Sequence, residues 1–228
     1  MSASLSLRVA FGLAGLPWLL ILPGACTAKD PVERAGLQVN QETREIRLGA
    51  IFHRKNAEAG TWHLLVKEGG SMASLACFTT NVGPRELYES LRRLGISDAN
   101  NVSSTNIAEE QIGTQGDKVR FFFLWSGLPA AIPLEDLLLE EVPAAAQGEA
   151  LKGLEMRVGG NFTGEDAGSP PAERSGCLAC LYTCSAGVIS NAKANLTLLR
   201  RDKGQYRYRL SPKVALADGA RVEVIVKN

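Results

Sequence analysis

The chain has 228 residues, of which 45% are hydrophobic and 21% charged, a composition typical of one folded domain with a substantial core. Its 25 basic and 24 acidic residues give a formal net charge of +1. This balance argues against a nucleic-acid-binding protein, because such a protein needs a basic surface to neutralise phosphates. Five cysteines are too few for a disulfide-knit mini-protein, although three of them lie close together in the sequence.

The N-terminus has the layout of a secretory signal. Arg8 is followed by an uncharged apolar run over residues 9–22, then by small residues, and the next charge appears only at Lys29. The apolar run is shorter than the roughly 20 residues that a membrane-spanning helix needs. The sequence therefore predicts an exported protein of the bacterial periplasm or cell envelope.

The segment LPGAC, which ends at Cys26, resembles the lipobox of bacterial lipoprotein signals, where the cysteine is lipidated after cleavage. Residues 1–25 are then a lipoprotein-type signal peptide, and 26–36 form a polar tether to the membrane. The usual leucine three places before the cysteine is replaced by Pro23. A soluble secreted form cut after Ala28, or a retained anchor, remain the alternatives. Cleavage before Cys26 removes one basic residue and no acidic one, so the mature chain has a formal charge of zero.

Short apolar runs begin at residue 37 and predict strands over 37–40 and 45–52. A further run over 62–67, a Gly-rich turn at 68–71 and a run over 72–79 together predict a β-hairpin.

The clearest helix is predicted over residues 84–94. Pro84 suits the first helical position, where its missing N–H costs nothing, and Gly95 is a natural stop. The apolar residues between them recur at helical spacing, at Leu87, Tyr88, Leu91 and Leu94.

The second half of the chain again favours strands. The aromatic run over 119–125 predicts a strand buried on both faces, and 133–142 predicts a second, short helix. Residues 96–118 and 163–176 are polar and predict loops. Further strands are expected over 154–162, 206–210 and 222–226. The fold class is α+β: a single domain over 37–228, with mostly antiparallel strands.

Several catalytic motifs are absent from the sequence. It contains no GxSxG elbow, no phosphate-binding GxxxxGK[ST] loop and no HExxH. Its two histidines, His53 and His63, limit nucleophile–base schemes. A non-enzymatic role is therefore the favoured expectation.

The remaining chemical signal is a C-x2-C-x3-C segment within residues 176–191. Thiolates at this spacing can chelate zinc, copper(I) or an iron–sulfur cluster, which would serve metal handling or electron transfer. The predicted metal ligands are Cys177, Cys180, Cys184 and Cys77, and His53 or His63 could replace Cys77, which also suits a core position.

Two alternatives remain for these cysteines. C-x2-C is also the spacing of a thiol–disulfide redox pair, and buried cysteines can simply pack in an interaction module. The ferredoxin motif C-x2-C-x2-C-x3-C-P is incomplete, because Arg174 and Ser185 occupy its first-cysteine and proline positions. The signal also lacks the twin arginine expected for export of a folded iron–sulfur protein.

The chain resembles the YdjY-domain family of exported bacterial proteins over about residues 40–200. The resemblance rests on the apolar run and turn at 62–75, the helix from Pro84, the aromatic strand that ends at Trp125, and the block that runs from CLAC to GVISN. The family often carries His-Glu-Ser where this chain has Met-Ala-Ser at 72–74, so no role for that histidine is carried over. The resemblance implies an envelope protein, sometimes labelled ferredoxin-like because of such cysteines, and supplies no substrate.

Overall fold

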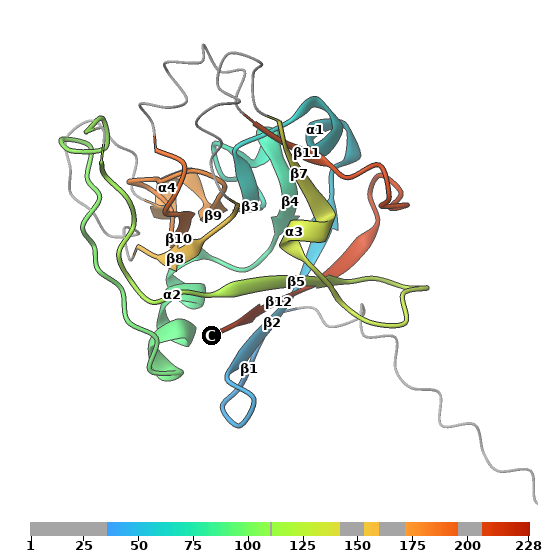
Figure 1. The fold of residues 1–228 in the computed structure, drawn as a ribbon. Coiled ribbons are helices and arrows are strands. Elements are labelled where there is room, and N and C mark those ends of the chain that lie inside the picture. Colours follow the sequence, from blue (N-terminus) through green and yellow to red (C-terminus); the bar gives the residue numbers. More distant parts are fainter. Residues whose placement is uncertain (1–35, 110, 142–152, 160–171, 196–206) are drawn as a thin grey trace, which may run out of the picture.

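The computed structural model describes residues 36–109, 111–141, 153–159, 172–195 and 207–228 (Figure 1). The predicted signal peptide, the lipidation of Cys26 and the tether up to residue 35 lie outside the described residues. No helix in the described part of the chain is long and apolar enough to cross a membrane.

The fold is built on one large twisted sheet. Its strands run in the order β6 (Ile132–Pro133), β5 (Arg120–Leu124), β12 (Arg221–Lys227), β2 (Glu45–Phe52), β4 (Ala76–Thr80), β3 (His63–Lys67), β9 (Cys177–Cys180), β10 (Ile189–Asn191) and β8 (Met156–Val158). β1 (Leu37–Asn40) pairs with the first half of β2, so the two strands predicted at 37–40 and 45–52 are confirmed.

The sheet is mixed rather than purely antiparallel. Most strand pairs are antiparallel, but β3 pairs parallel with β4, and β9 pairs parallel with β10. The expected hairpin over 62–79 is therefore wrong. After β3 the chain turns back through a short 3-10 helix, η2 (Ala73–Leu75), and enters β4 level with the start of β3. A Gly-rich turn between two apolar runs does not distinguish this tight crossover from a hairpin.

Four short helices accompany the strands in the described residues: α1 (Arg54–Ala59), α2 (Pro84–Arg93), α3 (Leu134–Leu137) and α4 (Ala172–Ser175). α2 confirms the amphipathic helix, with Pro84 in its first turn. The second helix, predicted over 133–142, is confirmed only at α3, because Leu138–Glu141 form the strand β7 instead. β7 and β11 (Arg207–Leu210) form a separate two-stranded sheet, which Figure 1 shows beside α1. The α+β class holds.

Two buried clusters of side chains divide the interior. The main core contains the largest buried side chains, among them Tyr208, Phe52, Phe78, Phe121 and Phe123. A smaller group, here called the cysteine cluster, consists of Val66, Ala76, Cys177, Cys180, Cys184 and Ala186. The predicted loop over 96–118 contains no regular element among its described residues.

Strand β5 is fully buried on one face only, whereas the sequence predicted burial on both faces over 119–125. Phe121 and Phe123 of β5 enter the core, but Phe122 on the opposite face is only partly buried. The Arg120 guanidinium and the Lys227 ammonium lie 4.9 and 5.6 Å from the centre of the Phe122 ring. Cations, not a second core layer, cover this aromatic ring, as its quadrupole allows.

Candidate metal centre

The cysteine segment becomes a strand in the interior of the sheet. β9 holds Cys177 and Cys180 at its two ends, and all four of its residues are buried. The loop over 181–188 returns the chain so that β10 can run parallel to β9. This return brings Cys184 into the same buried cluster as Cys177 and Cys180.

Bulges explain why two cysteines three residues apart share one face. In a regular strand, residues three apart point to opposite faces of the sheet. The register between β3 and β9 shifts twice, once between His63 and Leu65 and once between Leu65 and Val66. Bulges of this kind re-aim side chains. As a result Leu178 and Ala179 enter the main core, while both cysteines at the ends of β9 enter the cysteine cluster.

His63, from the start of β3, completes a group of three potential ligands. The donor atoms of His63, Cys177 and Cys180 all lie within 4.8 Å of one another, and all three residues are buried. The Cys177 Sγ and the His63 Nδ1 are 3.8 Å apart. A tetrahedral zinc ion with ordinary bond lengths separates a sulfur and a nitrogen ligand by about 3.6 Å and two sulfurs by about 3.8 Å. Small side-chain movements would therefore let the three donors bind one ion.

Cys184 lies beside this group without belonging to it. Its side chain is hydrogen-bonded with the Cys180 thiol, and its Sγ accepts a hydrogen bond from the Ala186 N–H at 3.4 Å. Gly187 leaves room for the sulfurs, since a Cβ there would lie 3.1 Å from the Cys180 Sγ. Cys184 is thus the nearest described candidate for a fourth ligand.

The electrostatics of the group favour a thiolate at Cys177. A hydrogen bond from the Cys180 thiol, and then one with His63, lower the pKa of Cys177 to about 5, although burial opposes the charge. The same interaction raises the pKa of Cys180 well above its usual range, with the hydrogen bond to Cys184 and burial adding to the effect. These contacts favour the thiolate form at Cys177, and the thiolate is the form of cysteine that binds metals.

Neighbouring side chains hold the ligands in place. The Ser175 Oγ accepts a hydrogen bond from the Cys177 N–H at 3.1 Å and donates one to the Ala172 carbonyl at 3.1 Å. The ring of Tyr182 stands edge-on to His63, with ring centres 6.4 Å apart. Such supporting contacts fix the orientation of a ligand before any ion binds.

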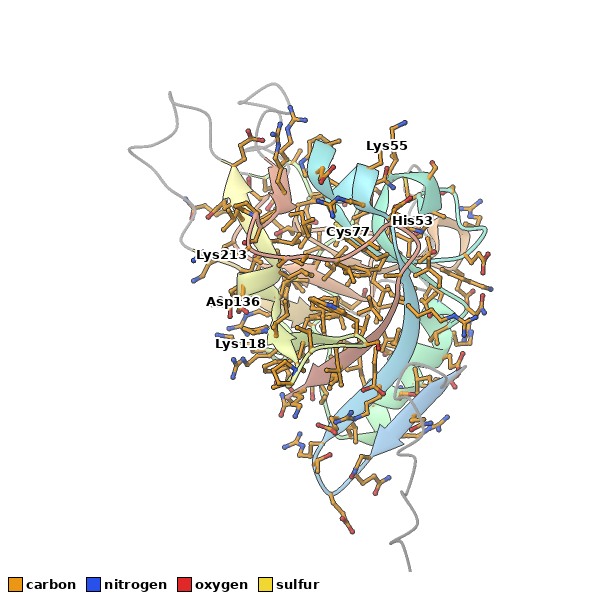
Figure 2. All side chains as sticks on the ribbon, turned by 90° about the vertical axis from the view of Figure 1, so that its right-hand side faces the viewer. His53, Lys55, Cys77, Lys118, Asp136 and Lys213 are labelled. Atoms are coloured by element: carbon orange, nitrogen blue, oxygen red, sulfur yellow. The ribbon has the colours of Figure 1, made fainter. Side chains whose placement is uncertain are left out.

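The structure does not bring Cys77 or His53 to this group. Cys77, on β4, faces the main core, and burial raises the pKa of its thiol to about 12. His53 shares a 2.8 Å hydrogen bond with the Thr79 hydroxyl through its Nε2. Figure 2 shows His53 and Cys77 close to each other, and the His53 N–H donates to the Cys77 carbonyl. Ala76, the neighbour of Cys77, points the other way into the cysteine cluster, so strand alternation separates Cys77 from the site.

Sequence reasoning proposed His63 only as one of two histidines and missed Ser175, Tyr182 and Gly187. The apolar run of β3 gave no hint that His63 and the distant Cys180 are direct partners across the sheet. Tyr182 and Gly187 lay within the segment already singled out. Their proximity to the cysteines in the sequence was the available signal.

No disulfide links Cys77, Cys177, Cys180 and Cys184, the cysteines within the described residues. Taken together, fold and site define a single mixed-sheet domain with a buried cysteine–histidine group. The sequence model of the YdjY-domain family matches residues 37–227, and the chain belongs to this family. It is 26% identical over 167 residues to the uncharacterized protein YdjY of Escherichia coli (strain K12), a match that covers 73% of this chain and 67% of that protein. No solved structure matches the chain.

Proposed function

We propose that this protein binds a single thiolate-preferring metal ion through His63, Cys177 and Cys180, and that it serves metal handling or electron transfer in the cell envelope. One observation carries the proposal: the three donor atoms converge within 4.8 Å although His63 is more than a hundred residues from the two cysteines in the chain. Two thiolates and an imidazole suit zinc and copper(I). A fourth ligand would come from Cys184 or from a small molecule.

The spacing of the donors favours one ion over an iron–sulfur cluster. In a [4Fe–4S] cluster each cysteine binds a different iron atom, so the sulfurs stand well apart, and a [2Fe–2S] cluster needs a second pair of ligands at its other iron. Here the Cys177 Sγ and the His63 Nδ1 are 3.8 Å apart, close to one edge of the tetrahedron around a single zinc ion, and all three donors lie within 4.8 Å of one another. The missing ferredoxin cysteine, replaced by Arg174, points in the same direction.

Burial argues for a protected ion rather than a catalytic one. Cys177, Cys180 and Cys184 are 2%, 0% and 3% exposed, and His63 is 8% exposed. A catalytic metal needs an open coordination position that a substrate can reach. A site enclosed in this way suits storage, transfer or a redox role, and His63 is its most accessible ligand.

Metal analysis of the purified protein tests the proposal. We expect one equivalent of zinc or copper per chain after anaerobic purification, and cobalt(II) substitution should give the intense absorption of thiolate-bound tetrahedral cobalt. Cys77→Ala is the matched control, because Cys77 is equally buried but faces the main core. The proposal would be overturned by protein that takes up no metal after anaerobic reduction and exposure to zinc and copper(I). A visible absorption spectrum typical of an iron–sulfur cluster would show that the site holds a cluster instead of a single ion.

We further propose that the protein is exported and attached to the membrane by a lipid on Cys26. The support is the signal layout and the segment LPGAC. In cells fed labelled palmitate, the wild-type protein should carry the label in the membrane fraction, whereas Cys26→Ala should not. Unlabelled wild-type protein in the soluble periplasmic fraction would favour the secreted form instead.

A thiol–disulfide function is the second candidate, and the low pKa of Cys177 beside Cys180 favours it. The attacking thiolate of such proteins must reach the disulfide of a partner, which burial of both sulfurs opposes. Thiol counting on aerobically exported protein distinguishes the two functions. An oxidised Cys177–Cys180 pair that exchanges with glutathione supports the redox role, and four unreactive thiols exclude it.

A further inference from the structure

A cleft of about 310 Å³ opens beside the cysteine cluster. Its walls come from the end of α1, the start of β3, the end of η2 and the start of β11, at Asn56, Ala59, Gly60, Thr61, Trp62, His63, Leu75 and Arg207. This volume falls at the lower end of the range for small-molecule sites, which are mostly apolar with a few fixed polar groups.

Two apolar side chains give the cleft its hydrophobic surface. Leu75 is 53% exposed, one of the few large apolar residues on the described surface. Trp62 is partly buried, and its ring stands edge-on to Tyr182 with ring centres 6.3 Å apart. A rigid aromatic ring and an exposed leucine would bury a flat apolar group without much loss of side-chain freedom.

Arg207 supplies positive charge in the same cleft. Its Nη1 donates to the Ala59 carbonyl at 2.9 Å, and its stem crosses Gly60, where any Cβ would collide with the arginine Cδ. Gly60 also has a positive φ of 85°, so the position favours glycine twice over. These contacts hold the guanidinium at the wall of the cleft.

The charge of Arg207 is incompletely matched by its neighbours. Among the described residues its buried Nε has no hydrogen-bond acceptor, and a carboxylate oxygen of Glu141 lies 3.7 Å from it. The same Glu141 oxygen lies 2.7 Å from the Nε of Arg209, which therefore takes the closer contact. A ligand carboxylate is the group that a guanidinium in this state recognises best.

Asn56 fixes a second polar position. Its side-chain amide donates to the Ser74 and Ala76 carbonyls at 3.0 and 2.9 Å, so both donor hydrogens are committed within the protein. Its Oδ1 remains as an acceptor at the wall of the cleft. The cleft thus offers a cation, an acceptor and an apolar surface.

We propose that this cleft binds a small organic carboxylate with a flat, apolar body. The carboxylate pairs with Arg207, and the body packs on Trp62 and Leu75. The site is distinct from the metal centre and does not require a metal. It shares His63 with that centre, so a bound carboxylate would touch the outer side of a metal ligand.

Calorimetric titration of metal-free protein with benzoate, and with benzamide as its neutral counterpart, tests this site. We expect saturable binding of benzoate and at least about tenfold weaker binding of benzamide, the effect of losing a charge-assisted hydrogen bond. Arg207→Gln should weaken benzoate about tenfold or more and leave benzamide unchanged. Arg209→Gln is the matched control, because Arg209 contacts the same glutamate outside the cleft, and should bind benzoate normally.

Three results would overturn the proposal: no saturable benzoate binding, equal affinity for benzoate and benzamide, or equal loss in the two arginine variants. The comparison of benzoate with benzamide uses the wild-type protein alone, so it decides the charge requirement even if Arg207→Gln fails to fold. Because no metal is present, failure here leaves the proposed metal centre untouched, and the reverse also holds.

Discussion

Cys77 and Cys177 are both buried in the same sheet, yet their chemical states differ greatly. Cys77 is surrounded by the aliphatic and aromatic side chains of the main core, and burial alone raises the pKa of its thiol to about 12. Cys177 is nearly as buried, but hydrogen bonds with Cys180 and His63 lower its pKa to about 5. Burial therefore does not decide whether a cysteine in this fold is inert. The polar groups within reach of its sulfur decide it.

The largest difference between the two cysteines should appear in metal affinity when a proposed ligand is removed. Cys177→Ser and Cys180→Ser should each weaken metal binding by more than about a hundredfold, because even supporting contacts around a metal contribute ten- to a hundredfold. Cys77→Ala should keep the wild-type stoichiometry. Competition with a chromophoric chelator measures all three. If the serine variants bind metal as tightly as the Cys77 variant, Cys177 and Cys180 are not the ligands and the proposed centre is wrong.

The second largest difference between Cys77 and Cys177 should appear in the thiolate absorbance of the metal-free protein. A pKa lowered to about 5 means that Cys177 is a thiolate above that pH and becomes protonated as the pH falls through it. A step at 240 nm with a midpoint near pH 5 is expected in the wild type and in Cys77→Ala, and it should vanish in Cys177→Ser. His63→Ala should move the midpoint upward, since His63 stabilises the thiolate. A midpoint near pH 9 in the wild type would contradict the described contacts.

The sequence predicted the cluster of three cysteines and left Cys77 either a metal ligand or a core residue, but it did not predict the site itself. Amphipathic spacing was enough to predict α2, and short apolar runs were enough to predict β1 and β2. The site depends on two register shifts between β3 and β9, which turn Cys177 and Cys180 to one face. Such bulges arise from pairing between segments more than a hundred residues apart, so no local pattern encodes them. The parallel pairing of β3 and β4 escaped prediction for another reason, because a Gly-rich turn between two apolar runs does not distinguish a crossover from a hairpin.

A hydroxyl in the main core should test Cys77 as a packing residue. Cys77→Ser places a polar group where the thiol now faces apolar side chains, and should lower the free energy of unfolding by about 1–3 kcal/mol. Cys77→Ala loses only the sulfur and should cost less, about 1 kcal/mol. Urea denaturation of the metal-free variants measures both. A neutral Cys77→Ser substitution would show that Cys77 has a polar neighbour, which would weaken the contrast between the two regions.

The smallest expected effect on metal affinity comes from crowding the Cys180 sulfur with an added methyl group at Gly187. In Gly187→Ala the new methyl group would lie 3.1 Å from the Cys180 Sγ, closer than carbon and sulfur normally approach, so the sulfur must move by a few tenths of an ångström. Because a metal ion tolerates little error in ligand position, we expect metal affinity to fall by about tenfold or less, with unchanged stoichiometry. Gly83→Ala is the control. Gly83 also has a backbone conformation that alanine can adopt, nothing lies within 4 Å of its added Cβ, and it sits at the start of α2, outside the cysteine cluster. Equal affinities in these two variants would mean that the Cys180 sulfur can shift without cost, and Cys184 would then be the better candidate for the second sulfur ligand.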